Sequence, residues 1–264
     1  MARGSSGPLT YPHAVSAGAI VLLTVVALLA GTVAAIGGGG GLITLPALLF
    51  AGLPPHMALA TNKGGSVFGS GAALATYWRH GQVDPRQAAW AFPLGLAGSL
   101  AGTAAVLVVA PATLRPLVIV LLVVAAAVLL VRRPTPAAAP ARRQLLAAGI
   151  ALVVGAYDGF FGPGTGTFLI VGFVLCGATL TAATADAKVV NFASNLAAVV
   201  LFASGGHVLW RVALPMAAGQ LAGGVLGARL AVRGGARLIR LVVVLVAAAL
   251  VAKLGIDLWR HGLA

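Results

Sequence analysis

Two polar stripes, each headed by a lysine, are the part of this sequence best suited to chemistry. Each stripe holds three residues at positions i, i+3 and i+7 of an apolar segment: Lys63, Ser66 and Ser70 in the first half of the chain, and Lys188, Asn191 and Asn195 in the second. This spacing places all three side chains on one face of a helix. Lysine supplies positive charge, and amides and hydroxyls donate hydrogen bonds to an oxyanion. The stripes therefore predict an anion site shared by both halves, unless the lysines snorkel to the membrane surface from helix starts.

A glycine-rich run precedes each stripe. The first is five consecutive glycines, residues 37–41, and the second reads Gly-Pro-Gly-Thr-Gly over residues 162–166. Such runs weaken a helix and let the backbone approach a ligand, and free N–H groups at the next helix start attract anions. Close helix packing through small residues is the alternative explanation. The predicted substrate-binding residues are Gly38, Gly39, Gly40, Asn62, Lys63, Ser66, Ser70, Gly164, Thr165, Gly166, Lys188, Asn191 and Asn195.

The acidic residues are few, and they limit the function further. The chain has no Glu, and its four acids are Asp84, Asp158, Asp186 and Asp257. Asp158 precedes the second glycine run and Asp186 lies two residues before Lys188, so both are candidates for carrying a coupling proton or pairing with a lysine. A helix-start cap is the simpler interpretation of Asp186. Without paired carboxylates or clustered His and Cys, we expect no enzymatic activity, no cofactor and no metal site.

The composition indicates that an integral membrane protein must position these residues. The hydrophobic fraction is 60%, charged residues make up 8%, and the mean hydropathy is +1.06. Soluble domains carry about 25% charged residues, so this chain lacks the polar side chains to cover a water-facing surface. The net charge of +13 comes largely from Arg residues in short gaps between apolar runs. Arg residues in such gaps set membrane topology, and we expect no nucleic-acid partner.

The glycines and the lysine recur at a constant offset of 125 residues. The matched positions are Gly39, Gly52, Lys63, Gly81, Gly98 and Gly102 in the first half, and Gly164, Gly177, Lys188, Gly206, Gly223 and Gly227 in the second. A tandem duplication that keeps glycines and one lysine in an apolar chain is typical of transporters built from two repeats.

Polar and Pro/Gly breaks divide the apolar material into ten predicted helical segments. They lie at residues 14–36, 42–53, 64–78, 87–110, 114–131, 144–161, 167–178, 187–204, 211–232 and 237–258. Segments 42–53 and 167–178 would be helices of about 18 Å, well short of the roughly 30 Å hydrocarbon core. Short segments at matching places in two halves indicate a transporter's binding site, so we expect half-helices after the glycine runs.

These segments predict an all-α membrane protein with four parts. They are an N-terminal tail at 1–13, a first transmembrane repeat at 14–131, a linker at 132–143 and a second transmembrane repeat at 144–264. Segment 14–36 is too long for the apolar core of a signal peptide, so we interpret it as a retained membrane helix. Four arginines place the linker in the cytoplasm and both termini outside. Five crossings per repeat make the repeats inverted, whereas re-entrant short segments would leave four full spans each.

Motifs in both halves carry a resemblance to a known family. In the second half, residues 158–168 read DGFFGPGTGTF, followed by AKVVN at 187–191 and GGHVLW at 205–210. In the first half, the glycine run, TNK at 61–63 and GQVD at 81–84 occupy the matching places. This combination resembles the sulfite exporter TauE/SafE family, also called the 4-toluene sulfonate uptake permease family, over nearly the whole chain outside the tail and linker.

The resemblance implies a multi-pass secondary transporter in a bacterial or archaeal inner (plasma) membrane. Its cargo would be sulfite, sulfoacetate or another organosulfonate, moved by alternating access, with export as the expected direction and proton coupling as a further expectation. A sulfonate has three oxygens and one negative charge, which suits helix N-termini and one or two lysines. An anion channel, or a carrier of another small anion such as a carboxylate, is the alternative. The expected partners are the small anion, the lipid bilayer and a second copy in a homodimer.

Overall fold

The computed structural model describes residues 15–110 and 140–261, and every regular element in these ranges is a helix. The helices are α1 (Ala17–Gly37), α2 (Gly41–Phe50), α3 (Pro55–Arg79), α4 (Pro85–Val108), α6 (Pro140–Phe160), α7 (Thr165–Leu175), α8 (Leu180–Ser204) and α9 (Trp210–His261). The predicted all-helical fold is confirmed for this part of the chain. The predicted segment 114–131, the tail and most of the linker lie outside the described residues.

Three of the described helices, α1, α4 and α8, are long and apolar enough to cross a membrane. Helices α2 and α7 are also apolar but have only 10 and 11 residues. At 1.5 Å per residue they reach about 15–17 Å, roughly half of the hydrocarbon thickness. Large apolar side chains such as Val21, Leu22 and Val153 are exposed on the outside of the helices. A surface of this kind suits contact with lipid.

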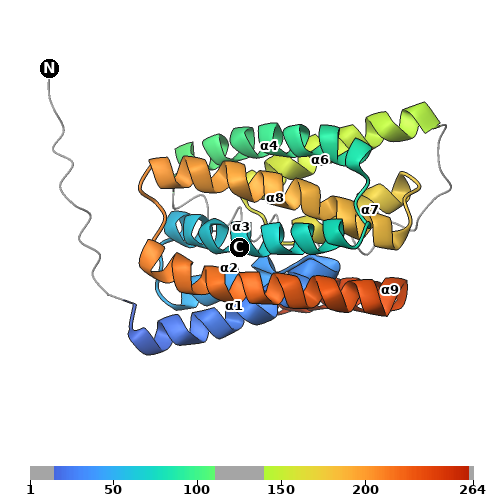
Figure 1. Ribbon diagram of the computed structural model, residues 1–264. Coiled ribbons are helices and arrows are strands. Elements are labelled where there is room, and N and C mark those ends of the chain that lie inside the picture. The colour runs from blue at the N-terminus through green and yellow to red at the C-terminus, as the bar shows by residue number, and fades with distance from the viewer. Residues whose placement is uncertain (1–14, 111–139, 262–264) are drawn as a thin grey trace, which may run out of the picture.

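The helices pack in matched pairs that follow the duplication. Helix α1 packs along α9 as α6 packs along α4, and α3 contacts α9 as α8 contacts α4. Exchanging α1–α4 for α6–α9 in chain order turns each of these four contacts into one of the others. Figure 1 shows α4 and α6 together on one side of the molecule, α1 and α9 on the other, and α3 and α8 between them. This packing brings α3 and α8, the two helices with polar stripes, into contact at the centre.

The duplicated glycines have physical roles that explain why they occur in both halves. Gly39 and Gly164 have positive φ angles of 82° and 86° in the loops before the two short helices. A residue with a Cβ is strained in that conformation. Gly98 lies so close to α6 that a Cβ would overlap a backbone carbonyl, and Gly223 lies equally close to α1. The helices of the two halves therefore approach each other through small residues, as membrane helices commonly do.

Two helix starts differ from the sequence prediction. Helix α3 begins at Pro55 rather than at residue 64, and α8 begins at Leu180 rather than at residue 187. Proline suits a helix start because the first N–H groups of a helix have no partner within it, and Thr179 caps α8 through its side-chain oxygen. The polar residues that suggested a break lie inside these helices, because neighbouring helices bury them.

Two boundaries in the second half also differ. Helix α9 covers both predicted segments 211–232 and 237–258, with a non-helical residue, Gly235, between them at φ 54° and ψ −156°. Helix α6 begins at Pro140, within the predicted linker. The prolines of the linker therefore do not all exclude a helix, since the last of them occupies a first helical position.

Candidate substrate-binding site

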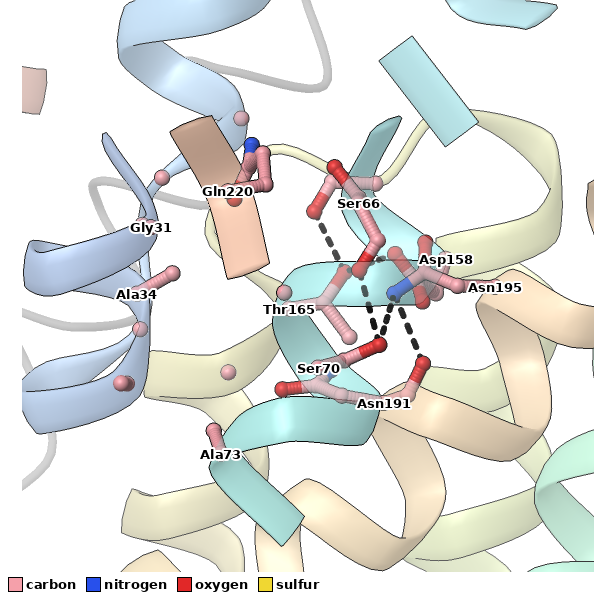
Figure 2. Close-up of a pocket in the computed structure, with 18 of the residues that line it drawn as sticks. Gly31, Ala34, Ser66, Ser70, Ala73, Asp158, Thr165, Asn191, Asn195 and Gln220 are labelled. Atoms are coloured by element: carbon pink, nitrogen blue, oxygen red, sulfur yellow. Dashed lines mark hydrogen bonds between the residues drawn. The ribbon is translucent and has the colours of Figure 1, made fainter. Parts of the chain in front are cut away.

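One cavity lies where α1, α3 and α8 meet the two glycine loops, and α9 closes one side of it (Figure 2). Its volume is about 70 Å³, enough for a few water molecules or one small anion. The predicted residues that line it are Gly38, Gly39, Gly40, Asn62, Lys63, Ser66, Ser70, Asp158, Thr165, Gly166, Lys188, Asn191 and Asn195. Gly164 and Asp186 are not in its wall. The structure thus brings most of the predicted set together, while their role in binding remains a prediction.

Both lysines are buried deep within their helices. Each is the ninth residue of its helix, Lys63 in α3 and Lys188 in α8, and each is only 2% exposed. A snorkelling lysine keeps its ammonium group in water at the membrane surface. The interpretation of these residues as snorkelling side chains at helix starts is therefore wrong.

Lys63 forms a buried ion pair with Asp158 of the other half. Its Nζ donates a hydrogen bond of 2.7 Å to Oδ1, and the two side chains are 3% and 5% exposed. The hydroxyls of Thr165, at 3.0 Å, and Ser194 also donate to this carboxylate. A buried charge is stable when it has an opposite charge and enough hydrogen bonds, and Asp158 has both. The pair ties α3 to α6, α7 and α8.

Lys188 occupies the equivalent place on α8 but has a different partner. Its Nζ donates a 2.7 Å hydrogen bond to the backbone carbonyl of Ala34, near the end of α1. The C-terminal end of a helix carries a partial negative charge, which favours a nearby cation. Among the described residues no carboxylate pairs with Lys188. The ammonium group is therefore hydrogen-bonded but lacks a counter-ion.

The two polar stripes meet across the interface between α3 and α8. The side-chain nitrogen of Asn195 lies 3.4 Å from the hydroxyl oxygen of Ser70, a weak contact, and donates a 2.7 Å hydrogen bond to the carbonyl of Asn191. The Ser70 hydroxyl donates at 2.8 Å to the carbonyl of Ser66. Figure 2 shows these four residues grouped beside Asp158 and Thr165. They give the cavity a polar wall formed by both halves.

The two glycine loops cross each other at the cavity. A Cβ on Gly38 would overlap the backbone of Gly166, and the hydroxyl of Thr167 donates a 2.8 Å hydrogen bond to the carbonyl of Gly37. Both short helices begin at the cavity wall, α2 at Gly41 and α7 at Thr165. Helix N-termini favour anions because their first N–H groups lack partners within the helix. Only glycine permits this crossing, so the runs do more than pack one helix against another.

Asn62 and Gln220 contribute to the wall in different ways. The hydroxyl of Thr44 donates a 2.5 Å hydrogen bond to the side-chain oxygen of Asn62, which fastens the short helix α2 to α3. Gln220 comes from α9 and is 3% exposed. It lies between Gly31 of α1 and Gly69 of α3, and a Cβ on either glycine would come within 3 Å of it. Gln220 was not among the residues predicted from the sequence. A lone amide in the apolar stretch of α9 was the available signal, because buried amides require polar surroundings.

Asp186 lies away from the cavity and binds a backbone amide. Its Oδ1 accepts a 3.2 Å hydrogen bond from the N–H of Asp84, at the start of α4. Thr61 holds the equivalent place in the first half, and its hydroxyl oxygen accepts a 3.1 Å bond from the N–H of Leu209, at the start of α9. The matched bonds indicate a structural role. The interpretation of Asp186 as a cap of its own helix start is wrong, because α8 begins earlier, at Leu180.

A second, larger cavity of about 380 Å³ lies among helix ends. Its wall includes Asp84, Arg86, Trp90, Arg143 and Phe173. Neither polar stripe reaches it, and its wall contains neither buried lysine. The smaller cavity is the better candidate, because the equivalent faces of the two halves converge there.

Comparison with known proteins shows what the chain is similar to. Residues 23–254 match the model of a family described as Sulfite exporter TauE/SafE. A probable membrane transporter protein, ORF9, from Sinorhizobium sp. is 37% identical over 242 residues, covering 90% of this chain and 93% of that protein. The probable membrane transporter protein YfcA from Escherichia coli K12 is 38% identical over 246 residues, covering 91% and 90%. A probable membrane transporter protein from Haemophilus influenzae is 37% identical over 247 residues, covering 92% and 97%. No solved structure matches the chain.

Proposed function

Because this chain belongs to the sulfite exporter TauE/SafE family, we propose that it is a secondary transporter of small sulfur-containing anions. The family and the relatives make it a multi-pass membrane transporter. Sulfite, sulfoacetate and other organosulfonates are the proposed cargo class, and export is the proposed direction. The cavity between α3 and α8 is the proposed binding site.

One observation carries the proposal: two buried lysines at equivalent positions of the duplicated halves line one small cavity. Lys63 and Lys188 are charged groups in a part of the protein where charge is costly, so a functional reason for them is expected. Hydroxyl groups, amide groups and two helix N-termini share the same wall. This combination suits an oxyanion, and the one carboxylate of the described wall already pairs with Lys63.

The contacts that close the cavity run between the halves, which suits alternating access. They include the Lys63–Asp158 ion pair and the Thr167–Gly37 hydrogen bond. In a transporter built from inverted repeats, one half rocks against the other around a fixed site. We therefore propose that the two halves are inverted, that the Thr167–Gly37 hydrogen bond breaks and re-forms as access changes sides, and that the Lys63–Asp158 pair stays intact at the fixed site.

A counterflow experiment tests the proposal. Purified protein in liposomes preloaded with sulfoacetate or sulfite should accumulate external labelled substrate, and Lys188→Met should abolish that accumulation. Arg79→Met, which removes an exposed cation outside the cavity wall, is the matched control and should leave it unchanged. Absence of counterflow with every sulfur oxyanion would reject the transport proposal.

The channel and carboxylate alternatives give different results in the same preparation. A channel would conduct current across a planar bilayer and show no counterflow. A carboxylate carrier would accumulate labelled acetate or malonate and ignore sulfonates. Proton coupling through Asp158 predicts that Asp158→Asn loses gradient-driven flux but keeps exchange, and loss of both would reject that route.

A further inference from the structure

The two equivalent lysines of the cavity are electrically unequal. Lys63 pairs with the carboxylate of Asp158 at 2.7 Å, whereas among the described residues the one hydrogen-bond partner of Lys188 is the carbonyl of Ala34. The difference arises from one position in the duplication. The residue that matches Asp158, at the offset of 125, is Val33 on α1. The first half therefore provides a lysine but no acid, and the second half provides both.

The charges of the cavity wall do not cancel. Among the described residues of the wall only Lys63, Asp158 and Lys188 carry charged side chains, which gives one negative and two positive groups. The negative group is fully engaged, since Asp158 also accepts hydrogen bonds from Thr165 and Ser194. With Lys188 protonated, the wall therefore has a net charge of +1, which resides on Lys188. Burying an unpaired charge is unfavourable, and an anion in the cavity would remove that cost.

Lys188 lines the cavity together with Asn191 and Gly166. Gly166 lies at the start of α7, and the place of its missing Cβ, which the Cα of Gly38 approaches to 2.7 Å, is 3.1 Å from the Asn191 Oδ1 and 3.6 Å from the Lys188 Nζ. The ammonium group, an amide and a helix N-terminus therefore share one part of the cavity wall. By contrast, the missing Cβ of Gly162 would stand 3.0 Å from both Lys63 Nζ and Asp158 Oδ1, so the space beside Lys63 adjoins a neutral pair.

From this asymmetry we infer that Lys188 binds the transported anion, that Lys63 and Asp158 remain paired, and that the site selects anions of charge −1 over anions of charge −2. The inference rests on the proposed function and narrows its substrate class to monoanions, such as a monosulfonate. A dianion would leave one negative charge uncompensated inside the protein, where charges interact far more strongly than in water.

Two probes of similar size and different charge test this inference. Isethionate carries one sulfonate and a hydroxyl, and sulfoacetate carries a sulfonate and a carboxylate. Binding to the purified full-length protein is measured by the shift in melting temperature as each probe is titrated. Wild type should bind isethionate about tenfold or more tightly than sulfoacetate, a ratio equal to about 1.4 kcal/mol. Asp158→Asn, which raises the wall charge to +2, should move the preference about tenfold toward sulfoacetate.

Two further variants keep the inference testable if Asp158→Asn does not fold. Lys63→Met combined with Asp158→Asn removes the pair at constant net charge and should keep the wild-type preference. Lys188→Met should abolish isethionate binding. Preference of wild type for sulfoacetate, equal binding of the two probes, or isethionate binding that survives in Lys188→Met would overturn the inference.

The outcomes separate this inference from the proposed function. If sulfonates bind but the preference does not follow charge, the monoanion claim fails and the transport proposal stands. If 3-hydroxypropionate, the carboxylate analogue of isethionate, binds and no sulfonate does, the sulfur cargo fails while the charge rule survives. If none of these anions raises the melting temperature, both fail.

Discussion

Removal of the Asp158 carboxylate should destabilise the protein strongly, because it leaves Lys63 as a second buried charge without a counter-ion. Both side chains of the pair are almost completely buried, at 3% and 5% exposure, and their contact is 2.7 Å. Removing one partner of such a pair costs about 3–5 kcal/mol. In Asp158→Ala the hydroxyls of Thr165 and Ser194 lose the carboxylate but keep the carbonyls of Gly162 and Asn191 as acceptors. We therefore expect a cost of about 3–5 kcal/mol, which comes mainly from the unpaired charge of Lys63.

The double variant measures the coupling energy between Lys63 and Asp158. Lys63→Met leaves Asp158 with two hydroxyl donors, so it should cost less than Asp158→Ala, about 3 kcal/mol. Lys63→Met combined with Asp158→Ala removes both charges and should cost at least about 2 kcal/mol less than the sum of the single variants. Asp84→Ala is the matched control. Asp84 is an exposed acid that caps α4 by accepting from the Arg86 N–H, and its loss should cost about 1 kcal/mol.

Reversible unfolding in mixed micelles, followed by far-ultraviolet circular dichroism, gives the free energy of unfolding for each variant. Melting temperatures provide a second measure if unfolding is not reversible. A cost for Asp158→Ala no larger than that for Asp84→Ala would refute the reasoning. Strict additivity of the two single variants would also refute it, because an ion pair requires coupling between its members.

Three further substitutions test other parts of the site. Gly38→Ala should destabilise the protein by about 2 kcal/mol or more and abolish transport, because its φ is 82° and a Cβ would overlap the second glycine loop. Gly18→Ala, at an exposed helical position with open space around it, should not destabilise the protein in the same unfolding assay. Asp186→Asn should keep both transport and the gradient dependence of transport in liposomes, because an amide oxygen still accepts a hydrogen bond from the backbone N–H at the start of α4. Loss of gradient dependence alone would instead indicate that Asp186 carries the coupling proton. Gln220→Leu replaces a buried amide of the cavity wall by an apolar group of similar size. It should weaken anion binding several-fold in a thermal-shift titration without lowering the melting temperature of the anion-free protein. Unchanged affinity would show that the amide does not face the anion.

The sequence was sufficient for the features that depend on local pattern. Apolar composition determined the helical membrane fold, since a chain with 8% charged residues must bury its surface in lipid. The constant offset of 125 residues identified the duplication, and the helix contacts follow it. Spacing at i, i+3 and i+7 put Lys188, Asn191 and Asn195 on one helical face, and all three line one cavity. Each of these features follows from periodicity or composition, which a single sequence contains.

Helix boundaries were less accessible to sequence reasoning. The polar triplet at residues 61–63 suggested the start of a helix, yet α3 begins at Pro55 and buries the triplet. Polarity signals a boundary only when the segment faces water or lipid, and α3 faces protein. Gln220 could not be assigned to the site for the same reason. The role of an amide in an apolar helix cannot be predicted until the residues around it are known.

Only the tertiary structure decided which charges meet. Asp158 and Asp186 were equal candidates in the sequence, and Asp186 lies only two positions from Lys188. In the folded protein Asp158 pairs with Lys63, 95 residues away, while Asp186 binds the backbone at the start of α4. Residues at positions i and i+2 of a helix point to different faces. Asp186 and Lys188 therefore do not meet, although only one residue separates them in the sequence. Packing of one half against the other brought Asp158 to the lysine of the opposite repeat, and it left Lys188 without a carboxylate partner among the residues that the structure describes.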